Sequence, residues 1–419
     1  MKNKVFLVSP HDFFLEKPGD RPPLGIAYLS SYLKSISHET SLFDLNHETK
    51  EQLMSAIARD APDIVCISVS TPNYNNCINL AKEIRASGFG GILVAGGNHV
   101  TDVPNEKPTL EAFDYVVVGD GENGLRKIIE ERPNIKIIIS PPVENLDLMP
   151  FPDYEGIRLE RYSMLIGGER AITISSSRGC YYGCVFCGSA KIKKWRPRSP
   201  ENVIKELELL VNKYNIRAFY FVDDIFSFNK DRVYEICRLM KERLPPVKWR
   251  ATTRVDLVDY ELLKEMKSAG CDILSFGFES GNEDILKKIK KGTGLERTRQ
   301  TVKWCKELGI KVKGFFIIGL PGETRETAEQ TINFAKELQL DYCDFYPLTP
   351  FPATPLWENP QNFGIEIIKP EESNWENYYQ VGKGGANEIL IKHNNLSAEE
   401  ILEFCRKGRE AIKEGMTYY

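Results

Sequence analysis

The sequence of 419 residues lacks a long apolar run, a strong charge of one sign and a signal-peptide pattern. No apolar stretch reaches the roughly 20 residues that a transmembrane helix needs, and Met1 leads directly into the strand-like segment VFLVSP. The chain has 55 Lys and Arg against 59 Asp and Glu, and its net charge of -4 gives no sign of a nucleic-acid or membrane partner. We therefore expect a cytoplasmic protein.

Several catalytic motifs are also missing from the sequence. It has no Walker loop, no nucleophile elbow, no calcium-binding loop and no His-Glu-x-x-His helix, so hydrolysis and phosphoryl transfer have no support. Ten cysteines in a chain of this length are too dilute for a disulfide scaffold. Most of them stand alone in apolar segments and are expected in the core, whereas a close cluster indicates metal binding or catalysis.

Short β-branched runs alternate with amphipathic helical patterns, which is typical of α/β units built on a parallel sheet. The first block predicts a doubly wound, flavodoxin-like or Rossmann-like domain over residues 1–140. A Pro-rich linker is expected over 141–168, because Pro150 and Pro152 prevent a helix there. The five expected strands of the first block are VFLVSP, TSLFDL, DIVCISVS, GILVAGG and DYVVVGD.

The second block predicts a partial (β/α)6 barrel of the TIM type over residues 169–356, because six strand candidates are too few for a closed barrel of eight. Residues 357–419 are expected to form a small, mostly helical C-terminal extension, with a helix near AEEILEFCRKGREAIKEG. The six expected barrel strands are AITISSS, AFYFVDD, KWRATTRVD, DILSFGFES, KVKGFFIIG and DYCDFYPLTP.

Three cysteines lie close together in SSSRGCYYGCVFCGS, as Cys180, Cys184 and Cys187. They follow the first barrel strand, and active sites of such barrels lie at the carboxyl ends of the strands. Soft thiolate ligands select iron–sulfur clusters or zinc. A zinc site would need a fourth ligand, but His99 and His393 are far away in the sequence. The spacing therefore favours a 4Fe-4S cluster in which one iron has no protein ligand.

This Cys-x3-Cys-x2-Cys pattern, with Phe186 before the third cysteine, resembles the hallmark of the radical S-adenosylmethionine (radical SAM) enzymes. The resemblance covers about residues 170–356. It implies that the open iron is chelated by the amino and carboxylate groups of SAM. It also implies that an electron from the reduced cluster cleaves SAM to give a 5'-deoxyadenosyl radical.

The same resemblance implies where SAM binds. Asp223 and Asp224, in FVDDIF, take the place of a Gly-Gly-Glu that holds the SAM amino group in the family. Arg254 could pair with the SAM carboxylate through its guanidinium fork, although a surface arginine is an equal alternative. Glu279, in GFESG, resembles the ribose-binding position, and Gly319 permits a close approach of the backbone near the adenine.

The first block resembles the cobalamin-binding domain that precedes the barrel in one branch of this family. The resemblance rests on PPLGIAYLSSYL, SVST, AGGNHVT and VVGDGENG, each at a strand end or a helix start. It implies that small residues line a slot for the nucleotide tail of cobalamin. The candidate cobalamin residues are Ser68, Ser70, Thr71, Gly96, Gly97, Asn98, His99, Gly119, Gly121 and Glu122.

Two other interpretations of the first block remain. GDGENG fits a dinucleotide fingerprint, but it follows the fifth strand rather than the first and lacks the acidic partner. A flavodoxin-like domain that has lost its cofactor is the second alternative.

The axial ligand of cobalamin is a separate question. The Asp-x-His-x-x-Gly motif that supplies a histidine ligand is absent, and none of His11, His47 and His99 has an Asp-x-His context. We therefore expect bound cob(II)alamin to be base-off and His-off.

Together the resemblances imply an oxygen-sensitive, cobalamin-dependent radical SAM methyltransferase that methylates an unactivated carbon through methylcobalamin. They also imply a ferredoxin or flavodoxin as electron donor. The substrate is expected to be a small molecule, a lipid, a natural-product precursor or a protein side chain such as glutamine. Two alternatives stay open, namely ring closure or rearrangement in tetrapyrrole or lipid biosynthesis, and a cofactor-binding or electron-relay module. A methylthiotransferase is disfavoured because the sequence has no second cysteine triad.

Overall fold

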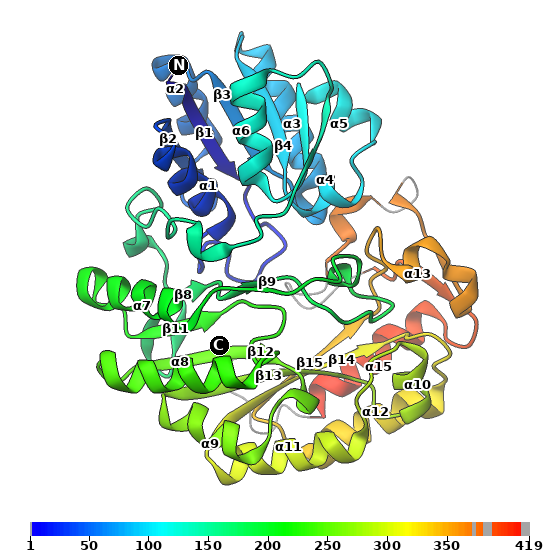
Figure 1. The fold of residues 1–419 in the computed structure, drawn as a ribbon. Helices are drawn as coiled ribbons and strands as arrows, with labels where there is room; N and C mark the ends of the chain where they lie inside the picture. The colour runs from blue at the N-terminus through cyan, green and yellow to red at the C-terminus, as the bar shows by residue number, and fades with distance from the viewer. Residues whose placement is uncertain (1, 371–373, 380–387, 412–419) are drawn as a thin grey trace. The chain divides into compact units, whose positions relative to one another are not determined.

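The structure is a computed structural model that describes residues 2–370, 374–379 and 388–411 (Figure 1). It divides into two compact units, one of Met1–Ser163 with Asn374–Tyr379 and one of Met164–Ser373 with Gln380–Tyr419. The expected linker 141–168 thus lies mostly in the first unit, and a short segment of the expected C-terminal extension also belongs to it. None of the helices in the described ranges is long and apolar enough to cross a membrane.

A parallel sheet of six strands forms the centre of the first unit, in the order β2-β1-β3-β4-β5-β6. This order reverses between β1 and β3, which is typical of a doubly wound fold and confirms the predicted fold class. The sixth strand was not predicted, because IIIS is only four residues long and only alternately buried. The strands are β1 (Lys4–Ser9), β2 (Glu39–Asp44), β3 (Ile64–Ser68), β4 (Ile92–Gly96), β5 (Tyr115–Gly119) and β6 (Ile137–Ser140).

Helices cover this sheet. Thr49 caps the N-terminus of the helix that begins at Lys50 and forms a capping box with Gln52, a pattern that can be recognised from the sequence. The helices are α1 (Leu24–Ser35), α2 (Lys50–Asp60), α3 (Tyr74–Ala86), α4 (Asn98–Asp102), α5 (Lys107–Ala112) and α6 (Gly121–Glu131). Short 3-10 turns are η1 (Thr71–Asn73), η2 (Leu146–Leu148), η3 (Leu159–Arg161) and η7 (Trp375–Asn377).

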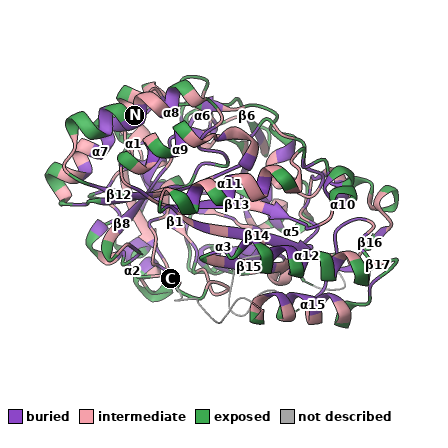
Figure 2. Cartoon of the chain, turned by 90° about the horizontal axis from the view of Figure 1, so that it is seen from below, coloured by how far each residue is buried: buried purple, intermediate pink, exposed green. Residues whose placement is uncertain are grey.

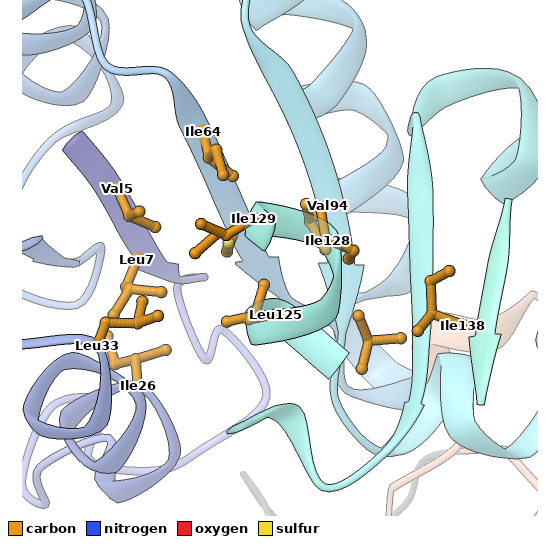
Figure 3. Close-up of a cluster of buried hydrophobic side chains, with 12 residues drawn as sticks. Val5, Leu7, Ile26, Leu33, Ile64, Val94, Leu125, Ile128, Ile129 and Ile138 are labelled. Carbon is orange, nitrogen blue, oxygen red and sulfur yellow. The ribbon is translucent and has the colours of Figure 1, made fainter. Parts of the chain in front are cut away.

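One face of the sheet packs against α1 and α6 (Figure 3). Val5 and Leu7 point to this face from β1, where they are buried with Leu33 of α1 and with Leu125 and Ile128 of α6. Each such side chain contributes about 1.5–3 kcal/mol when it leaves water. Because a shift of one residue along the strand would move these side chains to the opposite face, their burial also fixes the register.

The second unit is built on an open sheet in the order β15-β14-β13-β12-β11-β8-β7. All neighbours are parallel except β7, which pairs antiparallel with β8. The six predicted barrel strands are all present, and the sheet does not close, so the partial barrel is confirmed. The strands are β7 (Leu165–Ile166), β8 (Glu169–Ile174), β11 (Ala218–Phe221), β12 (Lys248–Thr253), β13 (Cys271–Glu279), β14 (Lys311–Ile318) and β15 (Tyr342–Pro347).

The connecting helices start at polar caps. Ser199, Asn229 and Asp259 each accept a hydrogen bond from the amide three residues further on. Figure 2 shows the strands largely buried and the helices with one exposed face. The helices are α7 (Pro200–Tyr214), α8 (Lys230–Arg243), α9 (Tyr260–Ser268), α10 (Glu283–Lys288), α11 (Leu295–Glu307), α12 (Arg325–Leu338), α13 (Pro355–Glu358) and α15 (Ala398–Glu410), with the 3-10 turns η4 (Gly188–Lys191), η5 (Val255–Leu257) and η6 (Pro360–Phe363).

The C-terminal helix α15 packs on β15, the last strand of the sheet (Figure 1). Arg409 donates a hydrogen bond of 3.0 Å to the carbonyl of Phe345. The helix therefore supplies a hydrogen-bond donor to a backbone carbonyl of the edge strand. Gly408 allows this approach, because a Cβ there would lie 2.6 Å from the Phe345 ring. The predicted helix is confirmed over Ala398–Glu410, and the end of the predicted segment, residues 412–415, lies outside the described residues. The two-stranded sheet of β16 (Ile365–Ile367) and β17 (Ile391–His393) was not predicted.

Candidate active site

The cysteine loop begins directly after β8 and is closed at its base by a second short pairing. There β9 (Ser177–Arg178) pairs antiparallel with β10 (Arg196–Pro197). Gly179 has φ +88, and a Cβ there would lie 2.3 Å from the carbonyl oxygen of Lys194. Only glycine fits this turn, which starts the loop that carries the three cysteines.

Buried charged groups fix the chain ahead of this loop. Arg198 donates to the carbonyl of Ser175 at 2.9 Å and pairs with Glu206 of α7 in a buried ion pair. Arg232 of α8 donates to the carbonyl of Ser176 at 2.7 Å. The chain ahead of the cysteine loop is therefore held by two guanidinium groups, one from the segment between β10 and α7 and one from α8.

Asp223, at the end of β11, belongs to the same supporting network. One carboxylate oxygen accepts from the Ser176 amide at 2.7 Å, and the other accepts from the hydroxyls of Ser176 and Ser177, both at 2.6 Å. Its carboxylate is thus already well hydrogen-bonded within the chain. The neighbouring Asp224 accepts one hydrogen bond, from Ser189 in the cysteine loop at 3.1 Å, and desolvation by surrounding atoms raises its pKa.

The three cysteines of the loop are free thiols. Cys180 and Cys184 are buried and Cys187 is half-buried. Burial raises the pKa of Cys180, and it raises the pKa of Cys187 to about 11. The charges of the neighbouring thiolates add to both shifts. Metal binding would displace the thiol protons.

Three soft thiolates are a donor set suited to an iron–sulfur cluster or to zinc. In the ranges that the structure describes, no three His, Cys, Asp or Glu side chains surround a point where one metal ion would be held. A tetrahedral zinc site needs convergent ligands, whereas each thiolate of a 4Fe-4S cluster binds a different iron. Phe186, between two of the cysteines, is half-buried.

Arg254 follows β12 and is buried, so the alternative of a surface arginine does not hold. It donates to both oxygens of Asp256, at 3.0 and 3.1 Å, and to the carbonyl of Lys291 at 2.7 Å. Its guanidinium lies 3.7 Å from the centroid of the Tyr182 ring in the cysteine loop. Arg254 therefore connects the end of β12 to the loop that carries the thiols.

Glu279 ends β13 in an unusual conformation. Its φ is +68, and the pairing of β13 with β14 shifts register between Gly277 and Glu279. The carboxylate is buried and lies 2.7 Å from the ammonium of Lys291. A side chain at Gly277 would overlap this pair, because a Cβ there would lie 2.2 Å from a Glu279 oxygen. A left-handed glutamate at a strand end is strained, and such strain concentrates at functional sites.

Gly319, in the loop after β14, also has a positive φ of +88. A Cβ on Gly319 would lie 3.1 Å from the Ile401 side chain of α15, so this glycine faces the C-terminal helix. The amides of Gly319 and Leu320 donate to the buried carboxyl of Glu323, at 2.5 and 3.3 Å. Burial raises the pKa of Glu323 to about 8. No motif in the sequence pointed to this buried acid.

The candidate cobalamin residues of the first unit gather at the carboxyl ends of β3, β4 and β5. The Val69 amide donates to the carbonyl of Gly96 at 2.7 Å, and the His99 amide donates to the carbonyl of Val69 at 3.1 Å. Gly97 has φ +105, and a Cβ there would lie 2.7 Å from the Val69 oxygen. Ser68, Thr71 and Asn98 lie in the same two loops, whereas Gly119, Gly121 and Glu122 lie at the junction of β5 with α6.

Three buried polar atoms in these loops have no hydrogen-bond partner among the described residues. They are the Ser70 hydroxyl, the side-chain oxygen of Asn73 and Nδ1 of His99. Buried polar groups without partners are costly, and a bound ligand or an ordered water that pairs with them would remove this cost. Cobalamin carries many amide side chains, so these atoms fit that cofactor. Asn73 was not among the predicted residues.

His99 is completely buried in a cluster that the sequence did not reveal. Its Nε2 lies 3.0 Å from one oxygen of Glu106, and the indole of Trp375 donates to the other oxygen at 2.8 Å. The rings of Tyr74 and Trp375 lie 4.4 and 4.8 Å from the His99 ring, centroid to centroid. Burial opposes the ionisation of Glu106, but these hydrogen bonds outweigh it and lower its pKa. The cluster joins segments 269 residues apart.

Comparison with known proteins agrees with this geometry. The Radical SAM superfamily matches residues 174–335, and the B12 binding domain matches residues 11–129. An uncharacterized methyltransferase, PH0819 of Pyrococcus horikoshii, is 33% identical over 412 residues, which cover 92% of this chain and 86% of the relative. An anaerobic magnesium-protoporphyrin IX monomethyl ester cyclase of Rubrivivax gelatinosus is 28% identical over 416 residues, covering 88% of this chain and 74% of the relative.

The fold has a counterpart among solved structures. The radical SAM methyltransferase TsrM of Kitasatospora setae, with cobalamin and a 4Fe-4S cluster bound, aligns with a TM-score of 0.74 and 19% identity, covering 99% of this chain and 90% of TsrM. The chain thus combines a cobalamin-binding fold with a radical SAM core. It belongs to the cobalamin-dependent radical SAM enzymes, whose cofactors are a 4Fe-4S cluster, SAM and cobalamin. The predicted activity, radical SAM methylation, is supported at the level of this class.

Proposed function

We propose that this protein transfers a methyl group to an unactivated carbon of its substrate. The observation that carries the proposal is the loop of Cys180, Cys184 and Cys187 in a chain that aligns over 92% of its length with a methyltransferase. When bound, the cluster would supply the electron for SAM cleavage and cobalamin would carry the methyl group. The protein would position both cofactors and the substrate.

The chain's own residues would divide this work between them. The three thiols would hold the cluster. The carboxylate of Asp224 accepts a hydrogen bond from Ser189 within the described part of the chain, so it has acceptor capacity left for the SAM amino group. The Glu279 carboxylate would accept from the ribose hydroxyls, and the Arg254 guanidinium would lie toward the SAM carboxylate. In the first unit, the loops with Ser70 and His99 would bind cobalamin.

The first experiment tests the cluster. Changing Cys180, Cys184 and Cys187 together to Ala in anaerobically reconstituted protein should remove the bound iron, the brown chromophore and the formation of 5'-deoxyadenosine. Changing Cys77, a buried cysteine of α3, to Ala is the matched control and should keep all three. A triple variant that still forms 5'-deoxyadenosine would contradict the proposal.

Ring closure is the second candidate, because the cyclase of Rubrivivax gelatinosus is 28% identical to this chain. The two chemistries differ in how they use SAM. A methyltransferase needs one SAM as methyl donor and another as radical precursor, so S-adenosylhomocysteine and 5'-deoxyadenosine should form in comparable amounts. Label from the SAM methyl group should appear in the product. Turnover that yields 5'-deoxyadenosine without S-adenosylhomocysteine would favour ring closure.

Three further parts of the proposal concern the surroundings of the reaction. The electron donor is proposed to be a ferredoxin or a flavodoxin, and the cytoplasm is the proposed location. The substrate is proposed to be a small molecule, a lipid or a protein side chain. Mass spectrometry of candidate substrates from cells that lack the gene, with comparison to the parent cells, would reveal which molecules lose a methyl group.

A further inference from the structure

Lys291 is a buried cation beside the candidate SAM site, and the sequence did not single it out. It lies between α10 and α11, and its ammonium is 2.7 Å from a carboxylate oxygen of Glu279 at the end of β13. Both side chains are less than a tenth exposed, at 9% and 8%. The two charges therefore meet away from bulk water.

The turn that carries Lys291 is attached to the cysteine loop. The Val185 amide donates to the carbonyl of Ile289 at 3.1 Å, and the Cys184 sulfur lies 3.9 Å from the carbonyl of Lys290. Arg254 donates to the carbonyl of Lys291 itself at 2.7 Å. The Lys291 backbone is thus held beside the thiols, so its side chain lies in the part of the fold where the cluster would bind.

Two energetic costs coincide at the Glu279–Lys291 pair. A buried ion pair loses the hydration of both charges and is weak support for stability. Glu279 also adopts a left-handed backbone conformation, which is unfavourable for a residue with a side chain. Because neither cost is needed to complete the sheet, the arrangement points to a ligand.

The pair has hydrogen-bonding capacity left over. An ammonium has three donors and a carboxylate has several acceptor positions. Among the described residues, each of these two charged groups makes its hydrogen bond with the other. Arg254 differs, because Asp256 and the Lys291 carbonyl already use its Nε and Nη2. Of these buried charged groups, the Glu279–Lys291 pair therefore has the most capacity left to form hydrogen bonds with two neighbouring hydroxyl groups.

We infer that Lys291 is a positioning residue of the SAM site, which holds the Glu279 carboxylate oriented to accept hydrogen bonds from the ribose hydroxyls of SAM. This inference rests on the proposed function, because it requires SAM to bind beside the cluster. Without Lys291 the carboxylate would be a buried charge without a partner, and it would turn away or take up a proton. In either case it would accept hydrogen bonds from the ribose less well.

The test measures SAM binding rather than turnover. The dissociation constant of SAM is obtained from the change in the electron paramagnetic resonance spectrum of the reduced cluster when SAM is added. Lys291→Met should weaken SAM binding by about 10- to 100-fold, as expected for the loss of a charged hydrogen bond. Lys291→Arg should restore most of the affinity. Lys287→Met removes an exposed lysine of α10 that pairs with Asp284 and should change nothing.

An analogue separates a ribose role from a structural one. Wild-type protein should bind the 2',3'-dideoxy analogue of SAM about as weakly as the Lys291→Met variant binds SAM, and the variant should hardly distinguish the two ligands. The double variant with Glu279→Gln should lose no more affinity than Glu279→Gln alone, because Lys291 acts through Glu279. Additive losses would overturn the inference, as would a Lys291→Met variant that binds SAM normally.

The outcomes also separate this inference from the proposed function. Wild-type protein that holds no cluster, or that does not cleave SAM, would contradict the proposed function itself. Wild-type protein that cleaves SAM, but binds the dideoxy analogue as tightly as SAM, would overturn the role of Lys291 alone. That second comparison needs no variant, so it can overturn the inference even where Lys291→Met does not fold.

Discussion

Glu323 allows a sharp test of the electrostatics in the second unit. It lies in the loop between β14 and α12 and is completely buried. One of its oxygens accepts from the amides of Gly319 and Leu320, while the other has no hydrogen-bond partner among the described residues. Burial raises its pKa from the usual 4.5 to about 8. The carboxyl should therefore be neutral in the folded protein at pH 7. Glu323→Gln, which is neutral at every pH and can accept the same two bonds, should be tolerated.

The magnitude follows from proton linkage. Because the folded pKa lies above the unfolded value, the stabilisation is complete below the unfolded value of 4.5 and is lost as the pH rises toward about 8. The slope is about 1.4 kcal/mol per pH unit, which gives an upper bound of about 5 kcal/mol across this window. The Glu323→Gln variant should lack this slope. Relative to wild type, its free energy of unfolding should rise by at least about 1 kcal/mol between about pH 5 and pH 8.

Guanidinium unfolding followed by tryptophan fluorescence measures this difference. Of the five tryptophans, Trp375 belongs to the first unit and the other four to the second, so the signal reports mainly on the unit that contains Glu323. Glu326→Gln, which removes an exposed carboxylate in the first turn of α12, is the control. A Glu323→Gln variant that loses stability relative to wild type as the pH rises would show that Glu323 is ionised and would refute the reasoning.

Three further predictions concern the first unit and the C-terminal helix. Bound cob(II)alamin should show no axial nitrogen splitting in electron paramagnetic resonance, and a triplet that disappears in His99→Ala would identify the ligand instead. Glu106→Gln should weaken the His99 cluster by about 1–3 kcal/mol in local hydrogen exchange, whereas Glu111→Gln, on the exposed side of α5, should not. Because its pKa is lowered, the contribution of Glu106 should persist above about pH 4.5 and fall as the pH drops through the lowered pKa; protection that is unchanged in acid would contradict this. Gly408→Ala should cost about 1–3 kcal/mol, because its Cβ would lie 2.6 Å from a ring of β15, and an unchanged thermal midpoint would argue against that packing.

The cysteine loop shows what could be predicted without the fold. Its ligands lie within eight residues of one another, from Cys180 to Cys187, so the spacing itself carries the chemistry. The parallel sheets were predictable for a similar reason, because strand and helix periods are local properties of the chain. β6 and the pair β16–β17 were missed because strands of three or four residues carry too little pattern.

The hydrogen-bond partners of the charged residues, in contrast, could not be predicted without the fold. From the sequence, a surface position was as good an interpretation of Arg254 as a role in the site. In the structure its side chain is buried and donates hydrogen bonds to Asp256 and to the carbonyl of Lys291. Lys291 looks like any other lysine in the run KKIKKG, and nothing in the sequence distinguishes it from its exposed neighbours. Burial decides its role, and burial depends on how α10 and the cysteine loop pack.

The two-block α/β architecture, the three thiols and the strand ends at which polar residues gather can all be predicted from the order of the residues, because each depends on residues close together in the chain. The folded chain is needed to see that Glu279 pairs with Lys291, that Asp223 supports the cysteine loop, and that Trp375 is linked to His99 through Glu106. These contacts join different elements of the fold, and their energies depend on the exclusion of water, which is a property of the packed molecule rather than of any stretch of sequence.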